Sequence, residues 1–116
     1  MRSVLSKKSK RAIDDAHVDL SPDHLRLIKK ILRDHLPGYE VRAFGSRIGG
    51  NAKRHSDLDL VVMTRMPLAM KTLALTKEAF SESDLPFKVD LIDWSLVSEE
   101  FKKIIIRQYG VVQESS

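Results

Sequence analysis

Residues 44–62 read FGSRIGGNAKRHSDLDLVV and contain the two most unusual features of this sequence. A Gly-Ser pair, Gly45 and Ser46, interrupts an extended run. Eleven residues after Ser46, Asp57 opens an Asp-x-Asp pair with Asp59, in an otherwise apolar run where charge is costly to bury. Side chains alternate along a strand, so the two carboxylates are predicted to share one side of it.

Two carboxylates that lie close together repel each other and raise each other's pKa, which a divalent cation would offset. Hard oxygen ligands suit Mg²⁺ or Mn²⁺. Asp90, which lies between apolar residues of another predicted strand, is the preferred third ligand because Asp93 has the opposite parity. We therefore predict a metal site formed by Asp57, Asp59 and Asp90. The residues leave one alternative open, in which all three are solvent-facing positions of amphipathic strands.

The Gly-Ser pair predicts a phosphate site, because a strand that passes into a helix there presents backbone N–H groups at a positive helix end. The Ser46 hydroxyl could add a hydrogen bond to a phosphate oxygen. A P-loop is excluded: Gly45 and Gly50 have its spacing, but Asn51 stands where its lysine belongs. A dinucleotide fingerprint fails on glycine spacing. Three cations could neutralise phosphate charge or be solvated surface residues: Arg47, Lys53 and Arg54.

Outward from this stretch, capping residues and apolar periodicity predict helices and strands in alternation. They are a helix from Pro22 that Pro37-Gly38 ends, a strand over 39–44, a short helix over 46–52, a strand over 56–63, a helix opened by Met66-Pro67 that runs to 81–84, a strand over 87–93 and a helix over 99–108. Val111 and Val112 add a strand or continue the packing. The order predicts an α/β or α+β fold with helices packed on a small β-sheet.

The last predicted helix is capped by Ser98 and stopped by Gly110. Its inner stripe is predicted to be Phe101, Ile104, Ile105 and Gln108. Because residues 104–106 are three consecutive isoleucines, at least one must point away from the core. That residue belongs to an interface or is an ordinary surface isoleucine.

Composition places the chain among ordinary globular proteins: 116 residues, 42% hydrophobic, 31% charged and without cysteine. The net charge of +4 lies in residues 1–11, which carry five cations and no acid, whereas the remainder is nearly neutral. We predict a basic, disordered tail over residues 1–19 and one domain over 20–116. No apolar run is long enough to span a membrane. We expect a cytoplasmic protein that binds neither membrane nor nucleic acid, although the tail could touch phosphates.

Gly-Ser, ten residues, Asp-x-Asp and a later acid on a neighbouring strand form a specific pattern. With Phe44, Arg47, Gly50, Ala52, Ser56 and the Asp-Leu-Asp-Leu run, the sequence over residues 20–112 resembles the minimal nucleotidyltransferases of the DNA polymerase beta superfamily. The resemblance implies that family's core, a small mixed sheet with the carboxylate strands adjacent.

The resemblance also implies an activity, in which a hydroxyl attacks the α-phosphorus of a nucleoside triphosphate, ATP being favoured. Asp57, Asp59 and Asp90 would be the catalytic and metal-binding residues for Mg²⁺. Gly45, Ser46 and Arg47 would bind the nucleotide.

The resemblance further implies a partner, because minimal members resemble antitoxins paired with an all-helical HEPN toxin that receives AMP. The chain lacks the extra helical domain of larger members, so we expect another chain to supply the acceptor and expect a homo- or hetero-oligomer. The alternative is a catalytically weak or inactive nucleotide-binding module that acts by binding a helical partner.

Overall fold

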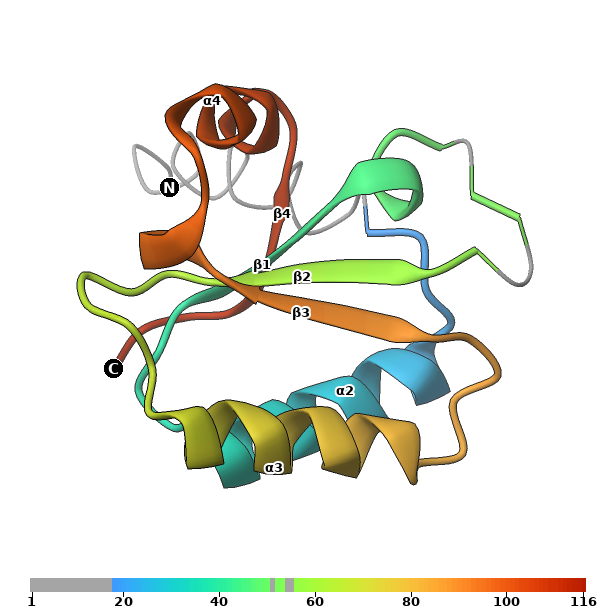
Figure 1. Cartoon of the computed structure of the whole chain (residues 1–116). Coiled ribbons are helices and arrows are strands. Elements are labelled where there is room, and N and C mark those ends of the chain that lie inside the picture. Colours follow the sequence, from blue (N-terminus) through green and yellow to red (C-terminus); the bar gives the residue numbers. More distant parts are fainter. Residues whose placement is uncertain (1–17, 51, 54–55) are drawn as a thin grey trace, which may run out of the picture.

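The computed structural model describes residues 18–50, 52–53 and 56–116, so the basic residues 1–11 lie outside the described part. The strands are β1 (Val41–Phe44), β2 (Leu58–Val62), β3 (Val89–Asp93) and β4 (Gly110–Gln113). They form one sheet in the order β3-β2-β1-β4, with β2 and β3 parallel and the other pairs antiparallel. Helices α2 (Pro22–His35) and α3 (Met70–Ser81) cover one face, and α4 (Glu99–Arg107) lies on the other (Figure 1). The predicted α+β fold with a mixed sheet is confirmed.

Helix α2 forms where its sequence signals predict it. The Ser21 side chain accepts a hydrogen bond from the His24 backbone N–H at 3.2 Å, and Pro22 occupies the first turn. Ile28 and Leu32 are fully buried on its inner face. Gly38, with φ of +86°, supplies the left-handed turn that leads into β1.

The first two described residues contact the domain. Val18 packs against the main core, and the Asp19 N–H donates to the Arg47 carbonyl at 2.6 Å. Residues 1–17 of the predicted tail lie outside the described residues.

Helix α3 begins at Met70, three residues after Pro67 of the Met66-Pro67 pair that was predicted to open it. The cause is a long-range contact: the Leu68 N–H donates to the carboxylate of Asp93 on β3 at 2.7 Å. The segment before the helix is thereby held against the sheet in a non-helical path. The helix then provides the crossover that parallel β2 and β3 require.

Helix α4 is capped as predicted, since the Ser98 side chain accepts from the Phe101 N–H at 3.2 Å. Its predicted inner stripe is only partly right, because Ile105 is buried whereas Ile104 is 57% exposed. Gly110 does not stop the helix; it is the first residue of β4, which confirms a strand at the C-terminal valines.

The two faces of the sheet carry cores of different size. Leu58, Leu60 and Val62 of β2 face the larger core under α2 and α3. Phe44, Val61 and Ile105 form the small core beneath α4. Asp59 shares the parity of Val61, so its carboxylate belongs to the less covered face. None of the helices in the described part is long and apolar enough to cross a membrane.

Candidate active site

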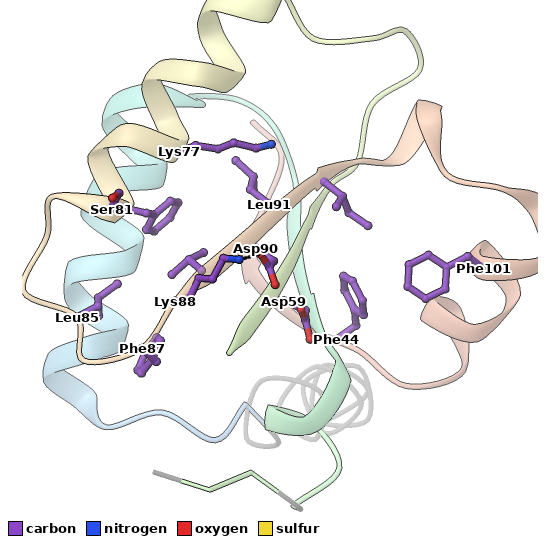
Figure 2. Close-up of a pocket in the computed structure, with 13 residues that line it drawn as sticks. Phe44, Asp59, Lys77, Ser81, Leu85, Phe87, Lys88, Asp90, Leu91 and Phe101 are labelled. Atoms are coloured by element: carbon purple, nitrogen blue, oxygen red, sulfur yellow. Dashed lines mark ion pairs between the residues drawn. The ribbon is translucent and has the colours of Figure 1, made fainter. Parts of the chain in front are cut away.

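The central pair of carboxylates comes from the two parallel strands. Asp59 on β2 and Asp90 on β3 are register partners and therefore lie side by side on one face of the sheet (Figure 2). Both are partly exposed and line the same pocket. Asp57 lies one residue before β2, outside the strand that was predicted to begin at Ser56, and is exposed. The predicted convergence of Asp59 and Asp90 is thus present, with Asp57 at its margin.

The charges in this cluster act on Asp59 most strongly. Burial raises the pKa of the Asp59 carboxyl above its ordinary value, and the neighbouring charges of Asp90 and Asp57 raise it further. Asp90 also faces a cation, since the Lys88 Nζ lies 3.5 Å from its Oδ1. The cluster therefore holds repelling negative charge that a cation would relieve.

The three aspartates are not preassembled around one point. Among residues 18–50, 52–53 and 56–116, no three acidic, histidine or cysteine side chains are grouped closely enough to hold a metal ion. Asp59 and Asp90 nevertheless face each other in register, and the charge of Asp57 reaches Asp59. The donors are carboxylates, the type that Mg²⁺ and Mn²⁺ prefer, but a single ion would have to draw them together.

The Gly-Ser pair forms a tight turn directly against Asp59. Residues Gly45–Arg47 make a 3₁₀ turn, η1, which is shorter than the helix predicted over residues 46–52. Gly45 has φ of +83°, and a Cβ added there would clash with Oδ2 of the Asp59 carboxylate. Only glycine lets the turn approach the carboxylate this closely. Ser46, the predicted phosphate ligand, is exposed at the same turn.

Arg47, predicted as a nucleotide ligand, is buried, which excludes the alternative of a solvated surface cation. Its side chain is only 6% exposed. Its guanidinium donates to the carbonyls of Ser56 at 2.9 Å and Asp19 at 2.9 Å, and stacks 4.1 Å above the ring of Phe87. These contacts assign Arg47 a role inside the fold.

Asp93 fills a different position from Asp90, in agreement with the preference for Asp90 as a site residue. It is buried and accepts hydrogen bonds from Thr64, the Leu68 N–H and Ser95. Burial tends to raise the pKa of Asp93, but these hydrogen bonds outweigh it and hold the pKa below its ordinary value. Asp93 therefore joins the ends of β2 and β3 to the start of α3.

A pocket of about 810 Å³ opens around β3 and contains Asp59 and Asp90. Phe44 and Phe101 line it on the α4 side, with ring centroids 5.7 Å apart in an edge-to-face arrangement, and Figure 2 shows the Phe44 ring beside Asp59 with the Phe101 ring beyond it. Lys77 of α3 and Lys88 line the other side. The sequence analysis did not assign these four residues to the site. Two signals were available: Phe44 belongs to the motif around the Gly-Ser pair, and Lys88 lies two residues before Asp90 and so on the same side of the strand.

A mixed sheet that places aspartates on adjacent strands beside a Gly-Ser turn agrees with the expected nucleotidyltransferase core. The chain belongs to the nucleotidyltransferase domain family, whose sequence model matches residues 25–113. Within it, the chain is 48% identical over 99 residues to the probable protein adenylyltransferase MntA of Haemophilus influenzae, covering 85% of this chain and 87% of that protein. The predicted resemblance to the minimal nucleotidyltransferases is thereby confirmed.

Solved structures agree with this assignment. A crystal structure of a toxin-antitoxin with AMP-PNP is similar at a TM-score of 0.66 and 26% identity, over 79% of this chain and 74% of that one. The complex of a tri-AMPylated Shewanella oneidensis HEPN toxin with its MNT antitoxin shares the fold at a TM-score of 0.56 and 23% identity, over 78% and 73%.

Proposed function

We propose that this protein transfers AMP from ATP to a hydroxyl group of a HEPN toxin, depends on Mg²⁺, and so acts as the antitoxin of a pair. The observation that carries the proposal is the register of Asp59 and Asp90, with Gly45 packed against the Asp59 carboxylate. The similarity to a probable protein adenylyltransferase at 48% identity supports the choice of AMP.

Asp57, Asp59 and Asp90 would hold the metal, since they supply hard oxygen donors whose mutual repulsion is unrelieved in the protein alone. Bound Mg²⁺ would neutralise triphosphate charge and align the attacking and leaving oxygens.

In the proposed reaction, a hydroxyl oxygen of the acceptor forms a bond to the α-phosphorus of ATP. The bond from that phosphorus to the bridging α,β-oxygen breaks, and pyrophosphate leaves with its electron pair. Asp90 accepts the hydroxyl proton, because its side chain is 43% exposed and borders the open pocket. The backbone of Gly45 and the hydroxyl of Ser46 hold the β- and γ-phosphates.

The pocket suits a nucleotide in size and composition. A volume of about 810 Å³ lies within the roughly 300–1,000 Å³ range of small-molecule sites. Its apolar side, with Phe44 and Phe101, and its charged side, with Lys77 and Lys88, match the two ends of a nucleoside triphosphate.

The partner is proposed from the similar complexes. A toxin-antitoxin bound to AMP-PNP and a tri-AMPylated HEPN toxin with its MNT antitoxin share this fold. We therefore propose a hetero-oligomer with a small helical HEPN protein, in the cytoplasm where ATP is available.

The test is transfer of label from α-³²P-ATP to a co-expressed HEPN protein, with Mg²⁺, comparing wild type with Asp57→Asn/Asp59→Asn. The double variant is expected to keep the fold and lose transfer, because two of the three charged metal ligands are gone. Equal labelling by the folded double variant would refute the proposal. Arg42→Lys, on β1 and outside the pocket lining, is the matched control and is expected to label normally.

A second candidate is a nucleotide-binding module that neutralises its partner by binding alone. It is favoured by the lack of a preassembled three-carboxylate metal site in the described residues. The same double variant distinguishes the two: a binding module would still neutralise toxicity in cells, whereas an adenylyltransferase would not.

A further inference from the structure

Arg47 contacts several chain segments that border the candidate site. Its Nε and one terminal nitrogen donate to the Ser56 carbonyl at 3.0 and 2.9 Å. The same terminal nitrogen reaches the Lys53 carbonyl at 3.5 Å, and the other donates to the Asp19 carbonyl at 2.9 Å. The guanidinium plane lies over Phe87.

Arg47 and the residues that it contacts lie close in the sequence to the candidate site residues. Arg47 directly follows Ser46 of the phosphate turn, and Ser56 directly precedes Asp57. Phe87 lies three residues before Asp90. A single buried cation therefore connects the phosphate turn with the chain segments that enter both carboxylate strands.

The chemistry of the side chain suits this position. A guanidinium presents several donors in one rigid plane and keeps its charge at any physiological pH. Lysine would retain the charge, but its compact ammonium group has no plane to stack on the aromatic ring and could not donate to carbonyls on two sides at the same time. The carbonyl of Ser56 receives two of the donors, which fixes the direction of the chain immediately before Asp57.

We propose that Arg47 is a positioning residue for nucleotidyl transfer, a clamp that sets the separation between the Gly45-Ser46 turn and Asp57. The clamp ties the residue that follows Ser46 to the residue that precedes Asp57, through the Ser56 carbonyl. It acts through backbone carbonyls and touches neither metal nor nucleotide. The role in transfer rests on the proposed function, whereas the clamp itself does not.

The chain offers a matched control. Arg42 also lies over an aromatic ring, 4.2 Å above Tyr109, and its Nε donates to Glu40 at 2.7 Å. It is partly buried on β1 but does not line the pocket. Arg42→Lys therefore removes a similar packed guanidinium without affecting the turn or the segment before Asp57.

The experiment compares wild type, Arg47→Lys and Arg42→Lys in two assays, after circular dichroism has shown that each is folded. The first is binding of Mn²⁺·ATP by calorimetry, with kcat and KM for transfer measured alongside. The second is the rate of tryptic cleavage after Lys53, which needs neither metal nor nucleotide and is expected to rise when its carbonyl is released.

For Arg47→Lys we expect affinity for Mn²⁺·ATP to fall by about 10- to 100-fold, which is the usual effect of replacing a residue that holds metal-binding side chains in place without contacting the metal. We expect kcat to fall as well, because the reacting groups are misplaced. Cleavage after Lys53 should accelerate. Arg42→Lys should match wild type in both assays.

Unchanged cleavage in Arg47→Lys overturns the clamp, and faster cleavage with unchanged Mn²⁺·ATP affinity overturns its positioning role. If wild type fails to bind Mn²⁺·ATP, the proposed function fails, while cleavage still decides whether the clamp exists. If Arg47→Lys does not fold, Phe87→Leu replaces it, with Tyr109→Leu as its control. The same directions of change are then expected, because the ring beneath the guanidinium is removed and its carbonyl partners remain.

Discussion

At the scale of single residues, Gly45 shows how closely the phosphate turn and the carboxylates are fitted together. It adopts φ of +83°, and the space that a Cβ would need is occupied by the carboxylate of Asp59. Gly50 has nearly the same φ, +79°, with nothing within 4 Å of its hypothetical Cβ. The two glycines thus share a backbone requirement, but only Gly45 has a steric one.

Gly45→Ala and Gly50→Ala are therefore expected to differ. Each should cost about 1 kcal/mol of unfolding free energy through the left-handed backbone conformation. Gly45→Ala should cost more than Gly50→Ala and should also weaken Mn²⁺·ATP binding, because Asp59 must move. Urea denaturation and calorimetry measure both effects. Equal losses of stability and binding in the two variants would contradict the close approach to Asp59.

Asp59 and Asp93 should respond to pH in opposite directions. The pKa of Asp59 is raised above 3.8, so the folded state loses stability as pH rises from 3.8 through the folded pKa. In EDTA, Asp59→Asn should raise Tm at pH 7 and have little effect near pH 3. The pKa of Asp93 is lowered below 3.8, so its contribution is present above 3.8 and is lost as pH falls through the folded pKa.

Asp93→Asn should therefore destabilise the protein at pH 7, by about 2 kcal/mol for weakened hydrogen bonds to a buried charged group. Thermal melts of both variants between pH 3 and pH 7 provide the comparison. Changes of Tm with the same sign at pH 7 would show that the two carboxylates are not in the opposed environments described.

At the scale of elements, α4 is anchored by few residues. Ile105 is 1% exposed between Phe44 and Val61, whereas Ile104 is 57% exposed. Ile105→Ala should cost about 2–5 kcal/mol, as other buried large-to-small changes do. Ile104→Ala should change stability by less than about 0.5 kcal/mol. Chemical denaturation measures both. Similar losses of unfolding free energy in the two variants would contradict the packing of α4 on the sheet through Ile105.

Features that depend on local interactions were predicted from the sequence, whereas features that depend on long-range contacts were not. Helix α2 was predicted because Ser21, Pro22 and its apolar stripe are local signals. The start of α3 was not, because a hydrogen bond from Leu68 to Asp93, 25 residues away, decides it. Which residues of α4 are buried depends on the small area of the sheet that the helix covers. The apolar periodicity of the sequence does not predict that area.

The same division holds in the site. Parity and apolar neighbours were sufficient to predict that Asp59 and Asp90 lie together. The buried position of Arg47 depends on Asp19, Ser56 and Phe87, which only the folded chain brings to it.

At the scale of the whole molecule, the candidate site is built from elements on three sides. The parallel strands β2 and β3 supply carboxylates, the turn η1 packs against the Asp59 carboxylate, and α4 contributes Phe101 to the pocket. A ligand that contacts all three would add a connection between the sheet and α4, which in the protein alone are joined by the small core beneath α4. Ligand binding should therefore stabilise the entire fold.

Mg²⁺ and ATP together are expected to raise Tm far more than either does alone. ATP without metal adds negative charge to repelling carboxylates, and Mg²⁺ without ATP meets aspartates that are not grouped around one point in the described residues. At a ligand concentration 100 times Kd, binding adds about 2.7 kcal/mol of stability. For a domain of this size that corresponds to a Tm increase on the order of 10 °C. Asp59→Asn should abolish the increase, and Arg42→Lys should retain it. An equal increase with ATP in EDTA would mean that the nucleotide binds without the carboxylates, and the metal site would have to be abandoned.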